Sequence, residues 1–418
     1  VGHCVRNSSI KHDPYQEPLI CNPYEFYSRT KGYRKIPGDV CIDGDQYLPE
    51  EVLCPFSEVQ DFLLLSQKKN IRRYNLITRK LELLLVKKLG NVVAFDFDMK
   101  SNCFYWGDII FKTIERQCLN GSKPEILVST DLVNVEGMAL DWMSNNLYFV
   151  LGKSSKIELI RTDTNHSGRM RRTVLGPNDL QKPRGIALHP KAGYMFWTDW
   201  AYANASIGRA DLDGKNIKKL FGAERVKWPN GITVDYIAER IYWVDAAFDY
   251  IANSDLHGDF FEYVIYKDKA VAQPFSIAVF KTKMYWTDWR NRAMFSADKD
   301  GQSDKEILGT FQYAMGLKVY GHGVRTGSNS CTDTSCPYIC VGKPGNGKAC
   351  LCPDGTKTAH LQHTLLIIIV SLQIWNSKTI RVTLFLLILF KTTAALICLP
   401  VMANVYPSSG VVIAPSTV

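Results

Sequence analysis

The chain has 418 residues, of which 46% are hydrophobic, so it is long enough to bury a large core and still leave room for small modules. We therefore expect several domains. Its 50 basic and 41 acidic residues give a formal net charge of +9, a modest excess that argues against a nucleic-acid partner and indicates a solvated surface.

We expect the first segment, residues 1–57, to be a disulfide module, because clustered cysteines are typical of proteins made in an oxidising compartment. Its cysteines are Cys4, Cys21, Cys41 and Cys54. Candidate N-glycosylation sequons, a second indication of the secretory route, stand at Asn7, Asn120, Asn165 and Asn204. The chain starts at Val1 without a signal peptide, so we expect it to be a fragment with further sequence upstream.

An aromatic pair then recurs at intervals of about 43 to 48 residues. The pairs are Tyr105 with Trp106, Tyr148 with Phe149, Phe196 with Trp197, Tyr242 with Trp243, and Tyr285 with Trp286. A short alternating segment precedes each pair by about twelve residues, and two more segments follow it. Four strands in such a repeat make one blade of a β-propeller, which buries its faces only against neighbouring blades.

The number of blades follows from the two ends of the repeat region. Residues 62–65 and 71–76 resemble the second and third strands of a blade that has no first strand, and residues 315–320 are a candidate for that strand. Pairing them closes the ring and removes an open sheet edge. The sequence therefore predicts an all-β fold with almost no helix, in which residues 58–326 form a six-bladed propeller.

Two repeats carry Phe196-Trp-Thr-Asp199 and Tyr285-Trp-Thr-Asp288, and residues 60–325 thereby resemble the class B (Tyr-Trp-Thr-Asp) propeller of the LDL-receptor family. The resemblance implies that the motif's aromatic residues pack within and between blades. It also implies that its aspartates tie neighbouring blades together. These would be Asp108, Asp199, Asp245 and Asp288. The second repeat has Leu151 at this position, so we expect its contact between blades to be weaker.

The run from Tyr27 to Cys41 is similar to the cysteine-rich end of the sortilin receptor domain, so residues 1–57 are expected to be the C-terminal part of such a domain. A sortilin-type module directly before a class B propeller is the order found in sortilin-related receptors, and Cys103 with Cys118 fits the first blade of that family. The resemblance implies a monomeric propeller in a receptor that binds protein cargo, including lipoprotein-related cargo. It also implies traffic between Golgi, endosomes and the cell surface.

Residues 327–358 resemble a partial EGF-like module, because the intervals between Cys331, Cys336, Cys340, Cys350 and Cys352 match its first five cysteines. The sixth cysteine is absent. The resemblance implies that Cys331 pairs with Cys340 and Cys336 with Cys350. Cys352 would then be unpaired unless Cys398 substitutes for the missing residue.

Residues 359–418 form a divergent apolar tail. The run 382–402 has 21 residues, about 31 Å as a helix, so it is a candidate membrane span. Lys391 and Pro400 oppose insertion, and Lys378 and Arg381 favour the wrong orientation. An alternative splice product, intron read-through or a gene-model error is the preferred explanation. Membrane association would otherwise come from this region or from sequence that is missing.

The sequence contains no phosphate loop, Gly-x-Ser-x-Gly elbow or His-Glu-x-x-His motif, so we expect a binding protein without cofactor or metal rather than an enzyme. A propeller enzyme with an axial metal, and an adhesive propeller without sorting function, stay as alternatives. We expect ligands on one propeller face, with Trp228 and Asn230 as speculative contacts. For Trp228 we favour packing between blades, and for Asn230 a turn. Four histidines titrate in the endosomal range and motivate a hypothesis of acid-triggered release: His166, His189, His257 and His322.

Overall fold

A computed structural model describes the propeller and part of the flanking segments. The described residues are 26–29, 50–53, 61–84, 89–119, 123–163, 170–321, 325–332, 336–360 and 396–400. Cys4, Cys21, Cys41, Cys54, Asn7, Asn120, Asn165, His166 and His322 lie outside them. Within the described part, every element longer than three residues is a β-strand, and the helices are the short 3-10 turns η2 (Lys269–Val271) and η3 (Pro344–Asn346).

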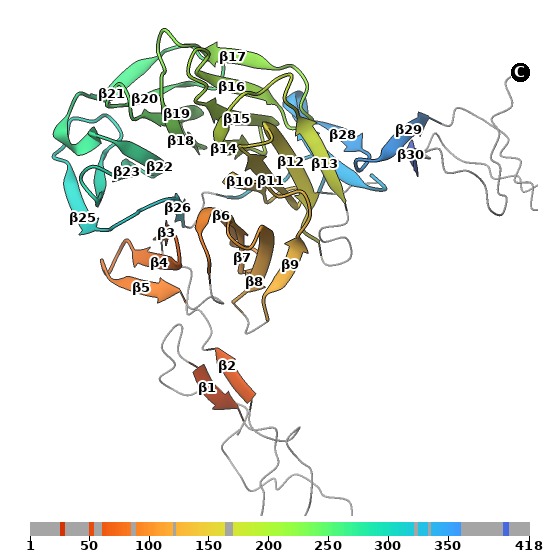
Figure 1. Ribbon diagram of the computed structural model, residues 1–418, viewed down its shortest axis with the longest axis horizontal. Coiled ribbons are helices and arrows are strands. Elements are labelled where there is room, and N and C mark those ends of the chain that lie inside the picture. Colours follow the sequence, from red (N-terminus) through yellow and green to blue (C-terminus); the bar gives the residue numbers. More distant parts are fainter. Residues whose placement is uncertain are drawn as a thin grey trace, which may run out of the picture.

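Six four-stranded antiparallel sheets surround a central axis as the blades of a propeller (Figure 1). Blade 1 contains β6 (Val92–Asp98), β7 (Cys103–Asp108), β8 (Thr113–Cys118) and β9 (Glu125–Val128). Blade 2 contains β10 (Val135–Asp141), β11 (Asn146–Leu151), β12 (Lys156–Arg161) and β13 (Arg171–Leu175). Blade 3 contains β14 (Pro183–His189), β15 (Tyr194–Asp199), β16 (Ser206–Asp211) and β17 (Lys218–Phe221).

The remaining three blades complete the ring, and in each blade the first strand in the order given lies nearest the axis. Blade 4 contains β18 (Pro229–Asp235), β19 (Arg240–Asp245), β20 (Tyr250–Asp255) and β21 (Glu262–Tyr266). Blade 5 contains β22 (Pro274–Phe280), β23 (Lys283–Asp288), β24 (Ala293–Asp298) and β25 (Glu306–Thr310). Blade 6 contains β26 (Leu317–Tyr320), β3 (Phe62–Gln67), β4 (Asn70–Asn75) and β5 (Leu81–Leu84). The predicted all-β, six-bladed fold is confirmed.

Blade 6 joins the two ends of the propeller sequence. Strand β26 pairs antiparallel with β3, with Leu317 opposite Leu65 and Tyr320 opposite Phe62. The same pairing continues beyond the strands, where the Ser66 amide donates to the Gly316 carbonyl at 3.0 Å. The predicted closure is thus confirmed, and the inner edge of β3 is paired rather than open.

The recurring aromatic pairs lie on the second strand of blades 1 to 5 and form the propeller core. Each of these ten side chains is at most 7% exposed, and Tyr148, Phe149, Phe196, Trp243 and Trp286 are fully buried. Because both faces of the second strand are covered by neighbouring blades, the strands read as apolar runs rather than as a simple alternation. The pairs therefore stabilise the fold and do not line an accessible site.

The aspartate that ends most of these second strands binds backbone amides of the loop that enters its blade. Asp245 accepts bonds from the N–H groups of Lys227 and Trp228 in the entering loop, and from Ala247 and Phe248 in the next turn. Comparable bonds are made by Asp108, Asp199 and Asp288. Leu151, at this position in blade 2, is buried and has no carboxylate to offer.

The segment after the propeller forms a small unit that we call the hairpin module, residues 325–332 and 336–356. Its strands β27 (Ile339–Lys343) and β28 (Gly347–Leu351) pair with each other. Disulfides join Cys331 to Cys340 and Cys336 to Cys350, which is the pairing that the resemblance implies, and another joins Cys103 to Cys118 in blade 1. Cys352 is also disulfide-bonded, which excludes the unpaired alternative and leaves pairing with Cys398 as the other expectation.

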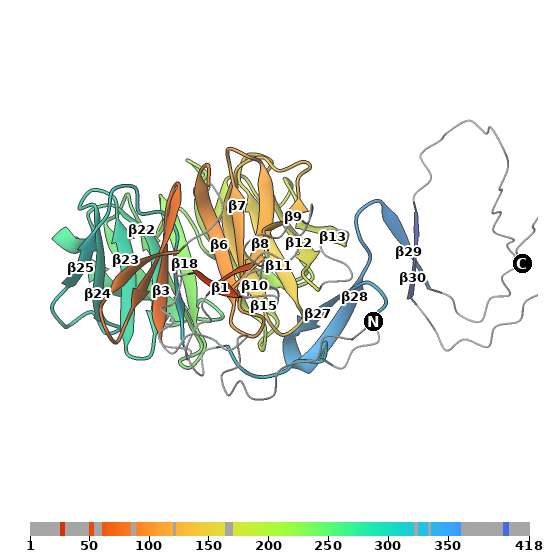
Figure 2. The same cartoon turned by 90° about the horizontal axis from the view of Figure 1, so that it is seen from below.

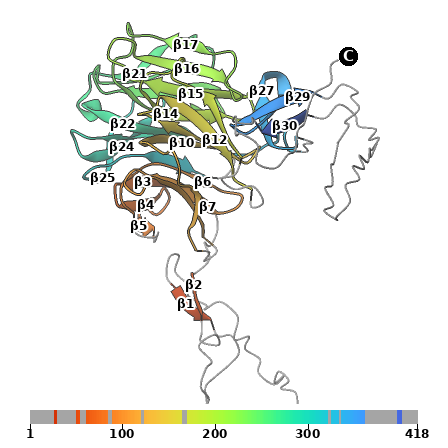
Figure 3. The same cartoon turned by 45° about the vertical axis from the view of Figure 1, so that its right-hand side comes forward.

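The hairpin module packs on blades 2 and 3, on the side that we call the hairpin face (Figures 2 and 3). Ile339 and Val341 are fully buried in the same cluster as Leu188 and Met195. The Asn146 amide donates to the Cys340 carbonyl at 2.6 Å. These contacts involve the turns that follow the first strands, so the described part of the module packs on the side of the ring opposite to the starts of the first strands.

Two further pairs of short strands lie in the flanking segments. Strand β1 (Phe26–Arg29) pairs with β2 (Glu50–Leu53), and β29 (Thr356–His360) pairs with β30 (Leu396–Pro400). Residues 396–400 belong to the apolar run 382–402, and the other residues of that run lie outside the described part. None of the helices in the described residues is long and apolar enough to cross a membrane.

Asp141 is a buried carboxylate whose hydrogen bonds satisfy only one of its two oxygens. Asp141, at the end of β10, accepts from the amides of Met143 and Ser144 through one oxygen, while its other oxygen is buried without a hydrogen bond. Burial raises the pKa of Asp141 to about 6, against the opposing pull of Ser144 and Met143. The ionised form is therefore penalised in the folded protein at neutral pH.

The first prediction concerns this penalty. A folded pKa above the unfolded value means that the folded state takes up the proton first, so stability from Asp141 is gained as pH falls from about 6 to about 4. Asp141→Asn should stabilise the protein at pH 7 by about 1–3 kcal/mol. Denaturant unfolding across pH 4–7 should show this advantage shrinking as the pH is lowered. An advantage that does not change with pH would contradict the assignment.

The second prediction concerns the aspartates that end the second strands. Asp245→Ala removes the acceptor for four backbone N–H groups and should lower the free energy of unfolding by about 2–4 kcal/mol. The matched control is Asp304→Ala in an exposed loop, which should change stability by less than about 0.5 kcal/mol. Equal effects of the two substitutions in urea unfolding would show that the motif aspartate does not hold the entering loop.

Candidate functional site

The inner strands converge so closely on the axis that glycine is required beside it. A Cβ atom added to Gly185 would lie 2.6 Å from the carbonyl oxygen of Asn230, and one added to Gly231 would lie 2.7 Å from Cα of Ser276. Such approaches are possible only without a side chain. The side chains next to these glycines therefore meet around the axis, where they surround the opening of a channel.

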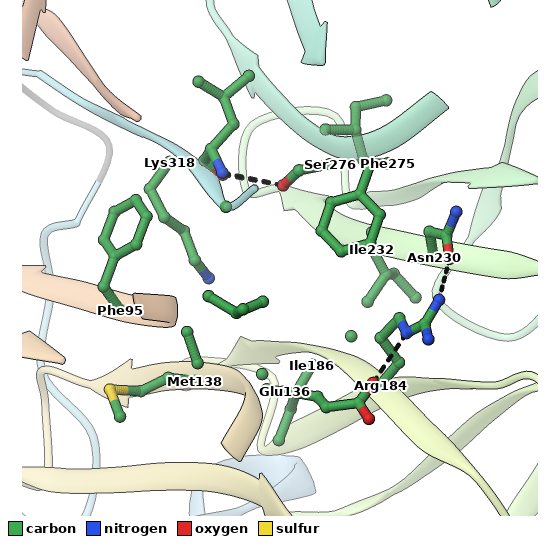
Figure 4. Close-up of a pocket in the computed structure, with 18 residues that line it drawn as sticks. Phe95, Glu136, Met138, Arg184, Ile186, Asn230, Ile232, Phe275, Ser276 and Lys318 are labelled. Atoms are coloured by element: carbon green, nitrogen blue, oxygen red, sulfur yellow. Dashed lines mark hydrogen bonds and ion pairs between the residues drawn. The ribbon is translucent and has the colours of Figure 1, made fainter. Parts of the chain in front are cut away.

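We call this opening the mouth, and the side of the ring that carries it the mouth face. The cavity at the mouth has a volume of about 60 Å³. Blades 1 to 5 contribute equivalent residues from the start of the first strand, Val93, Glu136, Arg184, Asn230 and Phe275, and blade 6 contributes Gly316, just before β26. The five equivalent positions carry chemically different side chains, so the mouth has an asymmetric surface (Figure 4).

Arg184 is held in the mouth by its neighbours on both sides. Its Nε donates to Glu136 Oε2 at 2.8 Å, and one terminal nitrogen donates to Asn230 Oδ1 at 2.6 Å (Figure 4). Asn230 in turn donates to the Pro274 carbonyl at 2.9 Å, and Asn134 donates to Glu136 at 2.6 Å. The chain of bonds crosses four blades. It fixes the guanidinium in one orientation, with 22% of the side chain exposed.

Aromatic rings flank this arginine. The guanidinium lies 4.4 Å from the centre of the Trp200 ring and 5.8 Å from that of Phe275. Phe275 stacks on Trp289 with centroids 4.1 Å apart, and the Trp289 indole donates to the Ala314 carbonyl. Trp289 is 38% exposed. A rigid arginine between tryptophan and phenylalanine is the side-chain composition of energetic hot spots in protein interfaces.

The two residues proposed from the sequence lie in this region in different roles. Trp228 is 46% exposed on the loop before β18, and its packing between blades stays a prediction. Asn230 is buried within β18 and bonds Arg184, so the expected turn is wrong. The Asn-Gly pair serves here for close approach to the axis rather than for reversal of the chain.

The other expected sites are distributed over the molecule. Asn204, on the loop between β15 and β16, is exposed and follows Trp200 by four residues. Of the two described histidines in the acid-release hypothesis, His257 is exposed and His189 is 2% exposed at the end of β14. Burial lowers the pKa of His189 against the opposing effect of Glu239. His189 follows the channel-lining part of β14 and does not line the mouth, so acid-triggered release stays a hypothesis.

Sequence reasoning missed Glu136, Arg184, Trp200, Phe275 and Trp289. The sequence feature that could have identified some of them is their position: Glu136, Arg184 and Phe275 occupy the same position of the repeat but are different residue types. A variable residue inside an otherwise regular repeat marks a position that packing does not dictate. Among the described residues there is no group of three or more His, Cys, Asp or Glu side chains that could hold a metal ion.

Comparisons with known proteins agree with this architecture. Residues 193–236 match the model of the low-density lipoprotein receptor repeat class B. The propeller is similar in fold to a chain in the crystal structure of a nidogen/laminin complex, with a TM-score of 0.56, 24% identity, and coverage of 62% of this chain and 98% of that one.

Three curated relatives share the name sortilin-related receptor. The protein from Mus musculus is 38% identical over 86% of this chain, that from Oryctolagus cuniculus 38% over 82%, and that from Homo sapiens 37% over 86%. The chain spans only 15–16% of the length of these relatives. The chain is a homologue of the sortilin-related receptors, and its core is a six-bladed propeller that carries the LDL-receptor class B repeat.

Proposed function

We propose that the chain is part of a receptor ectodomain that binds a protein ligand on the mouth face. The single observation that carries this proposal is Arg184, fixed between Glu136 and Asn230 and stacked against Trp200 at an accessible opening. A side chain ordered in this way loses little further entropy when a partner binds. The mouth cluster, which we define as Glu136, Arg184, Trp200, Asn230, Phe275 and Trp289, is the proposed contact area.

The position of the hairpin module supports the choice of face. Lys343 of the module lies 3.3 Å from Asp213 and 3.6 Å from Asp211, at the end of β16 away from the mouth. Asp354 bonds the Thr173 hydroxyl at 2.6 Å on the outer strand of blade 2. The module therefore occupies the hairpin face and the rim of blade 2. Among the described residues, none of its hydrogen bonds or ion pairs reaches the mouth cluster.

The chemistry of the mouth favours binding over catalysis. Its one carboxylate, Glu136, is already bonded to Arg184 and Asn134, so it is not placed to act as a general base. The arginine and aromatic surfaces instead suit a polypeptide that offers backbone carbonyls, carboxylates or flat side chains. We propose a monomeric propeller as the binding unit, with protein cargo as its partner.

The wider biology is proposed from the relatives, whose printed name is sortilin-related receptor. We propose that residues 1–57 are the end of a sortilin-type domain, that residues 58–326 form the propeller, and that residues 327–358 are a partial EGF-like module. On this basis the chain works on the lumenal and extracellular side of the secretory pathway, in a protein that sorts cargo between Golgi, endosomes and the cell surface. Membrane association would come from the tail or from sequence outside this chain.

The third prediction tests the mouth cluster directly. Residues 1–418, secreted behind a generic signal peptide and multimerised, would be screened against a panel of purified secreted proteins. For a ligand found in this way, Arg184→Ala should weaken binding at least about tenfold, because it removes the ordered cation of the cluster. Surface plasmon resonance with the purified ligand gives the dissociation constants.

The matched control is Phe260→Ala, which truncates a large side chain that is 78% exposed on the turn between β20 and β21, outside the cluster. It should leave the dissociation constant within about twofold. Thermal unfolding of both variants separates a binding defect from a folding defect. A ligand whose binding responds to Phe260→Ala and not to Arg184→Ala would place the contact area elsewhere on the ring.

A further inference from the structure

A lysine projects into the axial channel below the mouth. Lys318 lies on β26 and lines both the mouth cavity and a second cavity of about 30 Å³ beneath it. Figure 4 shows its ammonium group pointing into the space between the inner strands, beside Phe95 and Met138. The second cavity is also lined by Asp96, Tyr236 and Arg325.

The carboxylates that line the channel are already engaged by other groups. At the mouth, Glu136 binds Arg184 at 2.8 Å. In the second cavity, Asp96 lies 2.9 Å from Arg325 and accepts the Tyr320 hydroxyl at 2.6 Å and the Leu140 amide at 2.8 Å. Each carboxylate thus has its own arginine. The ammonium of Lys318 has no hydrogen bond or ion pair within 4 Å to any described residue.

At the level of Lys318 the only carboxylate among the equivalent residues is Asp96 of blade 1, which is already bound to Arg325. The register places Lys318 opposite Leu64, and the equivalent residues opposite the first aromatic of each pair are Asp96, Ala139, Ala187, Thr233 and Ala278. Apart from Asp96, these side chains are small and uncharged. Thr233 lines the lower cavity and offers a hydroxyl as a second donor.

The charge balance of the lower channel is therefore positive. Asp96, Arg325 and Lys318 together carry one excess positive charge around the lower cavity. Burial lowers the pKa of Lys318, Asp96 opposes this change, and Arg325 adds to it. Lys318 is partly buried. An ammonium that is partly removed from water without a partner carries a solvation cost, which a bound anion would offset.

We propose that the axial channel is an anion site, in which the Lys318 ammonium binds one small monoanion of the size of chloride or acetate. The one excess positive charge of Asp96, Arg325 and Lys318 indicates a monoanion, because a single negative charge neutralises it. The volume sets the size, because cavities of about 30 and 60 Å³ hold an ion or molecule only slightly larger than water. This site concerns the channel alone and does not depend on the proposed protein ligand.

The test compares the wild-type chain with Lys318→Met in chloride, acetate or gluconate at equal ionic strength, with gluconate as the ion too large to enter. Wild-type Tm should rise by a few degrees as chloride or acetate replaces gluconate, and the rise should saturate. Lys318→Met should show no such rise and should equal or exceed the wild-type Tm in gluconate. Lys215→Met, in an exposed loop, is the control that should behave like wild type.

A second measurement does not rely on a variant that folds. Quadrupolar broadening of the chloride-35 resonance by wild-type protein should be displaced by acetate and not by gluconate. The proposal is overturned if wild-type Tm and line width do not distinguish chloride from gluconate, or if Lys318→Met responds to chloride as wild type does. It is also overturned if chloride has no effect while Lys318→Met abolishes binding of a carboxylate-bearing protein ligand, because the source of the anion would then be that ligand.

Discussion

Closure of the ring is the constraint on which the other features depend. Each blade buries one face against the next, so an open arc would expose the inner strands of its two end blades. The chain solves this by pairing β26 with β3, more than 240 residues apart. A buried cluster seals the same joint: the Tyr320 hydroxyl and Arg325 both bind Asp96 of blade 1. The channel and its mouth exist only because this joint is closed.

The first strands of all six blades converge on one axis, and the different side chains at their equivalent positions form an asymmetric site there. Equivalent positions of different blades lie around the mouth, and each is free to carry a different side chain because packing demands only that the next residue be small, as at Gly185 and Gly231. Arg184 can therefore reach Glu136 of the blade before it and Asn230 of the blade after it. The hairpin module covers part of the opposite face and leaves the mouth accessible.

Most of the fold could be predicted from the sequence, because the aromatic pairs are buried in the same way in five blades and repeat at the length of a blade. The closing strand could be predicted from the one blade that lacked a first strand. The mouth cluster could not, since Glu136, Arg184 and Phe275 lie far apart in the chain and come together only where the blades pack around the axis. Asn230 was misassigned because Asn-Gly is a strong hairpin signal. Here Asn230 and the following glycine lie within β18, and the glycine allows the inner strands to approach closely at the axis.

The proposed function depends on the mouth face carrying the contact area for a protein ligand. Hydrogen–deuterium exchange of the chain, alone and in complex with a ligand, tests this directly, because it reports every backbone segment without a choice of mutation. We expect slower exchange in the complex at the starts of β10, β14, β18 and β22 and in the loops that carry Trp200 and Trp289. Protection confined to the hairpin module or to the outer strands, with the mouth unchanged, would contradict the proposal.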